Sequence, residues 1–143
     1  MNGLRRLAPA TGVGPNSTWG KLVTAGRLIF GISLMVAPKF TGGIWLGTAA
    51  QNPLMQYHSR ISGGREAALG LSLLAMSGNS AATRRLLWVG AAFDAWDGYA
   101  ALTADDSLAG VRRFHAVVAP ATWVALALVA AAQEQPSRTS SEG

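Results

Sequence analysis

The stretch from residue 86 to residue 104, LLWVGAAFDAWDGYAALTA, constrains the fold more than any other part of the chain. It is almost entirely apolar or small, yet it contains two acids, Asp94 and Asp97. As a helix it would be about 28 Å long, close to the hydrocarbon thickness of a bilayer. A carboxylate near the middle of a membrane costs roughly 2.5–3.5 kcal/mol on insertion scales, so two of them require compensating groups on other helices.

The composition favours a membrane protein of one domain. Charged residues make up 13% of the 143 residues, against a share of about 25% in soluble domains. The basic residues occur as scattered pairs beside apolar segments, whereas a nucleic-acid-binding protein would collect them on one face. The chain has no cysteine and two histidines, so neither a disulfide, a metal site nor a cofactor is predicted.

Four apolar segments predict an all-α fold, a bundle of four transmembrane helices with short loops. The membrane domain is expected to cover residues 18–133, with disordered tails at residues 1–17 and 134–143, which are rich in polar and small residues. The four predicted helices lie at about residues 19–37, 61–77, 86–104 and 114–132.

The connections carry further signals. Ser17 or Thr18 is expected to cap the first helix, and Pro38 is expected to end it. Residues 39–60 contain an apolar run that is too short to span a membrane. We therefore expect a loop at the membrane interface there, with an interfacial helix as the alternative and Trp45 at the depth of the headgroups.

The alternative fold is a soluble helical bundle with unusually apolar helices, because charged residues interrupt three of the four segments. The low charge content and the segment 114–132, which lacks Lys, Arg, Asp and Glu, favour the membrane. If all four helices span, one side holds Arg5, Arg6, Lys21, Arg84, Arg85 and Arg138, and the other holds Lys39, Arg60, Arg112 and Arg113. The positive-inside rule then predicts a multi-pass protein of the cell membrane with both termini in the cytoplasm.

Five charged side chains fall inside the predicted helices. Arg27 lies about 8–9 Å and Asp94 about 12–13 Å from the cytoplasmic side. Arg65 and Glu66 lie about 6–8 Å, and Asp97 about 10–12 Å, from the outer side. We therefore predict that Arg27 pairs with Asp94 and that Arg65 pairs with Asp97, with Glu66 adjacent.

This cluster has two interpretations. It can be a set of structural ion pairs that fixes the helix register. It can also be a functional polar pocket, because ionisable residues inside a membrane tend to be functional. Asp94 and Asp97 are three residues apart and share one helix face. His115 either joins such a pocket or anchors the fourth helix at the interface.

The order GRLIFG, GGREAALGLSLL and RRLLWVGAAFDAWDGYAAL resembles small four-helix integral membrane proteins of unknown function in actinobacteria and fungi. The resemblance covers about residues 19–132 and rests on Arg-x-x-x-Gly, Gly-Arg-Glu and Asp-x-x-Asp. Some fungal relatives of that kind act in polyketide pathways as membrane epoxide hydrolases. The resemblance thus implies a hydrolase, isomerase or cyclase whose matching candidate catalytic residues are Arg27, Arg65, Glu66, Asp94 and Asp97.

Epoxide opening is consistent with these residue types. One carboxylate would act as the base for water, and one protonated acid would donate to the epoxide oxygen. An arginine between two acids can hold them in opposite protonation states. A lipid-embedded pocket suits a lipophilic small molecule as the substrate.

Two further function classes remain open. The first is an assembly or adaptor subunit, because Gly63 with Ala67 and Gly64 with Ala68 have a small-xxx-small spacing that lets helices approach closely. The second is a component of a proton-coupled transporter, which would require an oligomer. The predicted partners are therefore the lipid bilayer, a lipophilic molecule, and a second copy or another membrane protein, with no nucleic acid.

Overall fold

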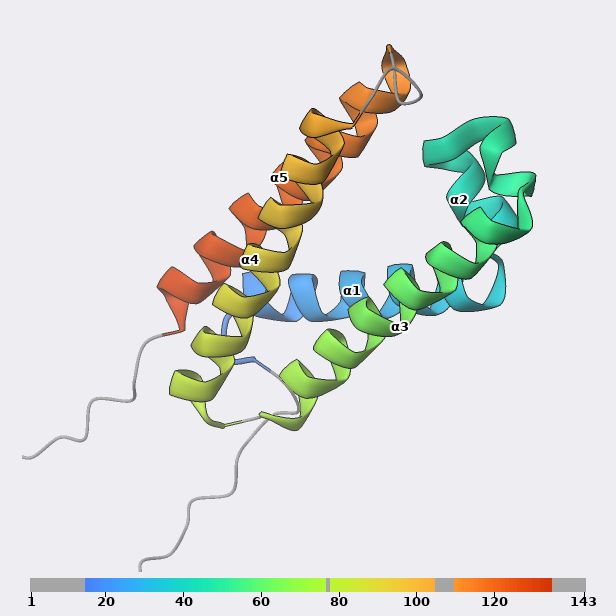
Figure 1. Cartoon of the computed structure of the whole chain (residues 1–143). Coiled ribbons are helices and arrows are strands. Elements are labelled where there is room, and N and C mark those ends of the chain that lie inside the picture. Colours follow the sequence, from blue (N-terminus) through green and yellow to red (C-terminus); the bar gives the residue numbers. More distant parts are fainter. Residues whose placement is uncertain (1–14, 77, 105–109, 135–143) are drawn as a thin grey trace, which may run out of the picture.

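A computed structural model describes residues 15–76, 78–104 and 110–134. These residues are almost entirely helical and contain no strand, which confirms the predicted all-α class. The described elements are α1 (Thr18–Val36), α2 (Pro38–Leu46), the 3₁₀ helix η1 (Gly47–Gln51), α3 (Pro53–Ala75), α4 (Ser80–Thr103) and α5 (Val111–Gln133), shown in Figure 1. Most of both predicted tails, residues 1–14 and 135–143, lies outside the described ranges.

The first helix begins and ends close to the predicted positions. Ser17 caps α1, and its hydroxyl accepts a hydrogen bond from the N–H of Gly20 at 2.9 Å. The helix ends at Val36, two residues before Pro38. Pro38 therefore ends one helix, as predicted, but it also begins the next one.

Of the two alternatives for residues 39–60, the loop is wrong, because the segment is helical. This segment consists of most of α2, all of η1 and the first two turns of α3. Pro38 and Pro53 each occupy the first turn of a helix, where the missing N–H has no intrahelical partner to lose. Asn52 caps α3 by accepting the N–H of Leu54 at 2.8 Å. Proline and asparagine here start helices rather than marking a loop.

Two of the predicted helices are longer than hydropathy indicates. α3 begins at Pro53 instead of residue 61, and α4 begins at Ser80 instead of residue 86. Asn79 caps α4 by accepting the N–H of Ala82 at 3.0 Å. Polar and charged residues near these ends lower the hydropathy but remain compatible with a helix, because arginine is a good helix former.

The long helices form two antiparallel pairs, α1 with α3 and α4 with α5 (Figure 1). α1 also packs on α5, whereas α3 and α4 make little direct contact. The pairs meet near the turn between α3 and α4 and diverge toward α2. The four long helices are therefore splayed, and they leave a gap between α3 and the α4–α5 pair.

The closed end of the splayed helices holds the apolar core. Its members come from the start of α1, the end of α3, the start of α4 and the end of α5: Val23, Leu73, Leu87, Ala130 and Ala131. A hydrogen bond of 2.7 Å from the N–H of Ser17 to Oε1 of Glu134 joins the start of α1 to the end of α5. The first and last helices are thus fixed to each other at this end.

Small residues allow close contact between α1 and α3. A Cβ atom on Gly31 would lie 2.5 Å from the backbone N of Ala67, and one on Gly63 would lie 2.6 Å from the carbonyl oxygen of Gly31. Neither contact leaves room for a side chain. The predicted close approach at Gly63 and Ala67 is confirmed, whereas Gly64 faces open space.

The outer surface of the helices is largely apolar. Large exposed side chains include Ile29, Ile32, Val36, Trp88, Trp96, Leu102, Phe114 and Val129. Among the described helices, α1 and residues Arg112–Gln133 of α5 are long and apolar enough to cross a membrane. α3 and α4 are also long, but they carry charged residues along their length. Two of the four predicted spans are therefore supported by length and composition.

The close α1–α3 contact predicts that replacing glycine by alanine has opposite effects on folding stability at Gly63 and at Gly64. Gly63→Ala should destabilise the protein, because the new methyl group meets the backbone of Gly31. Gly64→Ala should be neutral or stabilising by up to about 1 kcal/mol, since alanine is the better helix former. Thermal unfolding in detergent, followed by circular dichroism, measures the difference. Equal melting temperatures for the two variants would contradict the observed helix contact.

Candidate functional site

Arg27 is the largest of the fully buried side chains, with 1% of its surface exposed. Its Nη1 donates to Oε2 of Glu66 on α3, and its Nη2 donates to Oδ2 of Asp94 on α4 at 2.5 Å. The two carboxylate side chains are 7% and 6% exposed. One guanidinium from α1 thus connects α3 with α4, the two helices that barely touch directly.

Two glycines make room around Arg27. A Cβ on Gly90 would lie 2.8 Å from Nη2 of Arg27, and a Cβ on Gly26 would lie 2.3 Å from the ring of Trp123. The Trp123 ring on α5 covers the guanidinium, with 5.5 Å between Cζ and the ring centroid, which is within cation–π range. All four long helices therefore contribute to the environment of this one side chain.

Arg65 forms a second, more exposed layer. Its Nη2 donates to Oδ2 of Asp97 at 2.5 Å and lies 3.2 Å from Oε1 of Glu66. The side chains of Arg65 and Asp97 are 30% and 39% exposed. The ring of Phe93 lies 5.5 Å from Cζ of Arg65. This pair is therefore accessible in a way that the Arg27 layer is not.

The structure joins all five predicted charged residues into one network. Both predicted pairs, Arg27 with Asp94 and Arg65 with Asp97, are present. The bridging position of Glu66, which contacts both arginines, was not predicted beyond adjacency. Arg65 and Glu66 are neighbours in sequence but point about 100° apart around the helix, so Glu66 reaches α1 while Arg65 reaches α4.

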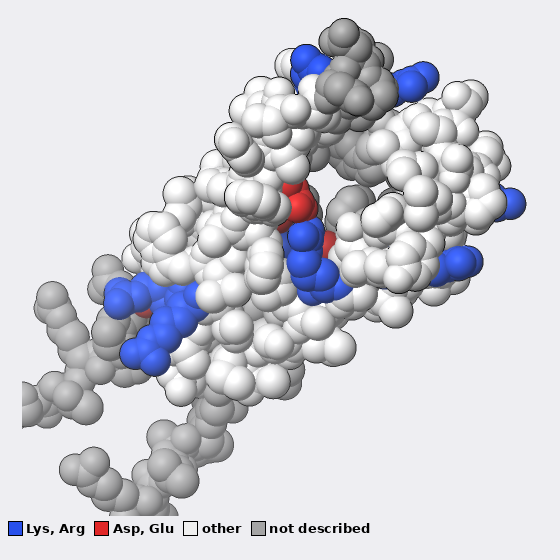
Figure 2. Space-filling view, viewed as in Figure 1, with Lys and Arg blue, Asp and Glu red and all other residues white. Residues whose placement is uncertain are grey.

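A cavity of about 570 Å³ lies over this network, within the range of small-molecule sites. Arg65, Glu66, Asp94 and Asp97 line its floor, and they are the charged residues among its lining. In Figure 2 blue and red atoms lie in the hollow between the two helix pairs, surrounded by white surface. A molecule in the cavity would meet the second layer of charges directly.

The two sides of the cavity differ in polarity. The side formed by α3 presents Met55, His58, Ser59, Ser62, Arg65 and Glu66. The side formed by the end of α4 and by α5 presents mainly small or apolar residues, Ala101, Ala116, Ala119, Pro120 and Trp123. The cavity is therefore amphipathic, with its polar side on α3.

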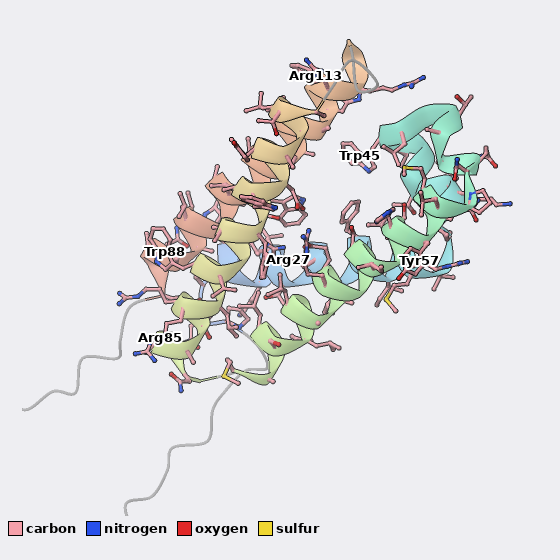
Figure 3. The ribbon with its side chains drawn as sticks, in the orientation of Figure 1. Arg27, Trp45, Tyr57, Arg85, Trp88 and Arg113 are labelled. Carbon is pink, nitrogen blue, oxygen red and sulfur yellow. The ribbon has the colours of Figure 1, made fainter. Side chains whose placement is uncertain are left out.

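Trp45 and His115 are cavity residues as well. Trp45 points from α2 into the gap (Figure 3), and its ring centroid lies 6.3 Å from that of Phe30 and 6.1 Å from that of His115. Its indole N–H is buried and has no acceptor among the described residues. Trp45 thus lines the cavity from α2, a helix that the sequence offered only as the alternative to a loop. Of the two alternatives for His115, the structure supports membership of the pocket.

No group of three or more His, Asp or Glu side chains among the described residues could hold a metal ion. The carboxylates instead contact guanidinium groups. Comparison of the chain with protein-family models, with curated proteins and with solved structures finds no match. The function must therefore be inferred from the cavity and its charges.

Replacing arginine by methionine should cost different amounts of folding stability in the buried layer, at Arg27, and in the exposed layer, at Arg65. Arg27→Met leaves Glu66 and Asp94 buried without their main counter-charge, which should destabilise the protein by about 3–5 kcal/mol. Arg65→Met, in the exposed layer, should cost about 1 kcal/mol or less. Unfolding in detergent, monitored for both variants beside the unmodified protein, measures the two losses. A loss for Arg65→Met as large as that for Arg27→Met would contradict the division into two layers.

Proposed function

We propose that the chain is a small multi-pass membrane protein in which α1, α3, α4 and α5 all cross the bilayer. The 23 residues of α3 and the 24 residues of α4 give lengths of about 35 Å, enough to span. Their central charges contact one another inside the molecule, which lowers the cost of placing them in lipid. The exposed aromatic and aliphatic residues on the outside suit acyl chains.

We further propose that both termini lie in the cytoplasm. The start of α1 and the end of α5 are joined by the hydrogen bond between Ser17 and Glu134. Figure 1 places the turn between α3 and α4 at the same end, and Figure 3 places Arg85 there. Lys21 and Arg84 belong to the same helix ends, and the sequence assigns six basic residues to this side against four to the other, in agreement with the positive-inside rule.

This topology can be tested directly because the chain has no cysteine. Thr48→Cys in η1 and Ala81→Cys at the start of α4 are both exposed positions at opposite ends of the helices. A membrane-impermeant maleimide added to intact cells should label Thr48→Cys. It should label Ala81→Cys only after the membrane is opened. Labelling of both variants from outside would contradict the proposed topology.

The activity that the cavity supports best is acid–base opening of a lipophilic epoxide by water. The observation that carries this proposal is the exposed Arg65–Asp97 pair on the floor of an otherwise largely apolar cavity. Apolar walls would hold the body of such a substrate, and the carboxyls would reach its only reactive polar group. The resemblance of the sequence motifs to small membrane proteins with epoxide hydrolases among them supports the same reaction.

The charges of the network favour one protonated carboxyl group beside ionised carboxylates, which gives a proton donor and a proton acceptor. Three carboxyl groups, on Glu66, Asp94 and Asp97, contact two guanidiniums. A net negative charge in an apolar cavity is costly, so the network is expected to hold one proton. Asp94 and Asp97 lie one helix turn apart, about 4.5 Å along the axis, on one face.

We assign the two roles from exposure and contacts. Asp97, the most exposed of the three carboxylates in the network, takes a proton from water as the water oxygen forms a bond to an epoxide carbon. The carbon–oxygen bond of the epoxide breaks, and its oxygen receives the proton held by Asp94. The product is a vicinal diol, and proton transfer within the network restores the starting state. Arg65 holds Asp97, and Arg27 holds Asp94.

Asp97→Asn should remove the base and lower turnover about 100- to 10,000-fold without unfolding the protein. The assay measures conversion of a lipophilic terminal epoxide to its diol in detergent or nanodiscs. The reaction is run in oxygen-labelled water, and mass spectrometry detects the labelled diol. Trp88→Phe, an exposed position outside the cavity, is the control and should retain full activity.

Two outcomes would contradict the enzyme proposal. Unchanged turnover in Asp97→Asn would show that the carboxylate is not the base. Absence of turnover in the unmodified protein, together with a membrane protein that co-purifies with it, would favour the assembly function. In that case the gap between α3 and the α4–α5 pair would hold the partner.

A further inference from the structure

The polar side of the cavity extends beyond the charged floor. His58, Ser62 and Glu66 succeed one another at four-residue intervals on α3, so they share one face of the helix. All three line the cavity. The α3 face therefore offers polar groups one and two turns away from Glu66 on the charged floor.

Ser62 has an unused hydroxyl in this position. Several other hydroxyl residues of the helices, Thr24, Ser33, Thr103 and Thr122, donate to backbone carbonyls three or four residues earlier in their own helix. Ser62 makes no such bond and has no other hydrogen-bond partner within the described residues. A serine hydroxyl in a helix either bonds back to the preceding turn or stays open to other partners. The Ser62 hydroxyl is thus available to a molecule in the cavity.

The opposite side of the cavity offers few competing polar groups. It is formed by Ala101, Ala116, Ala119, Pro120 and Trp123, with His115 as its polar member. A bound molecule with polar atoms along one edge would therefore turn that edge toward α3. Its apolar edge would contact α5.

We propose that Ser62 forms a hydrogen bond with a second oxygen of the substrate. The substrate is then a lipophilic epoxide that carries a hydroxyl or carbonyl group near the epoxide ring. Ser62 lies three to four residues from Arg65 and Glu66, about 4.5–6 Å along α3. The second oxygen should therefore lie at about that distance from the epoxide. This inference rests on the proposed function, because it assumes that the epoxide occupies the floor.

The test uses unreactive product analogues, so that binding is measured without turnover. One probe is the ten-carbon terminal diol, and the other is the same diol with an additional hydroxyl on the sixth carbon. Trp45 and Trp123 line the cavity, so a change in tryptophan emission in nanodiscs reports binding. The unmodified protein should bind the triol about five- to tenfold more tightly than the diol, the effect of one net hydrogen bond.

Ser62→Ala should abolish the preference for the triol and leave the affinity for the diol unchanged. Ser72→Ala is the matched control, because Ser72 lies on the same helix but does not line the cavity; it should retain the preference. Equal binding of the two probes by the unmodified protein, a preference that survives in Ser62→Ala, or no binding of either probe would overturn the inference.

Turnover measured on the same preparations separates this inference from the proposed reaction. A Ser62-dependent preference without any epoxide hydrolysis would leave the binding site in place and remove the reaction. Epoxide hydrolysis without the preference would leave the reaction in place and remove the role of Ser62.

Discussion

The burial of Arg27 is the interaction on which the rest of the structure depends. A guanidinium in an apolar interior requires counter-charges, because an unpaired buried charge costs far more than folding can offset. Its counter-charges come from Glu66 on α3 and Asp94 on α4, while Trp123 on α5 covers it. The two helix pairs are therefore held together at the level of this side chain, although α3 and α4 make little direct contact.

The same contacts place a second, accessible layer of charge. Glu66 contacts both arginines, so fixing Glu66 against Arg27 also positions Arg65 and its partner Asp97. The structural and the functional interpretations of the cluster therefore do not exclude each other. Arg27 holds the helices together, and the carboxyl groups of both layers, on Glu66, Asp94 and Asp97, line the cavity.

The cavity exists because the helix pairs diverge above this level. α2 and η1 fold back on α1 and α3 rather than closing the gap to α4. Trp45 reaches across from α2 toward α5, where its ring contacts His115. The result is a polar side on α3 that faces a mainly apolar side on α5, which suits a molecule with oxygens along one edge.

The sequence by itself determined the all-helical class, the approximate position of four long helices and the two ion pairs. Hydropathy and the rise of 1.5 Å per residue are local properties that translate directly into helix length and charge depth. Helix starts at Pro53 and Ser80 escaped prediction, because capping by Asn52 and Asn79 extends helices into polar sequence. Only the tertiary structure decided that Glu66 bridges both arginines, that α2 forms, and that Trp45 and Ser62 line a cavity, since these depend on helix rotation and on the angle between the helix pairs.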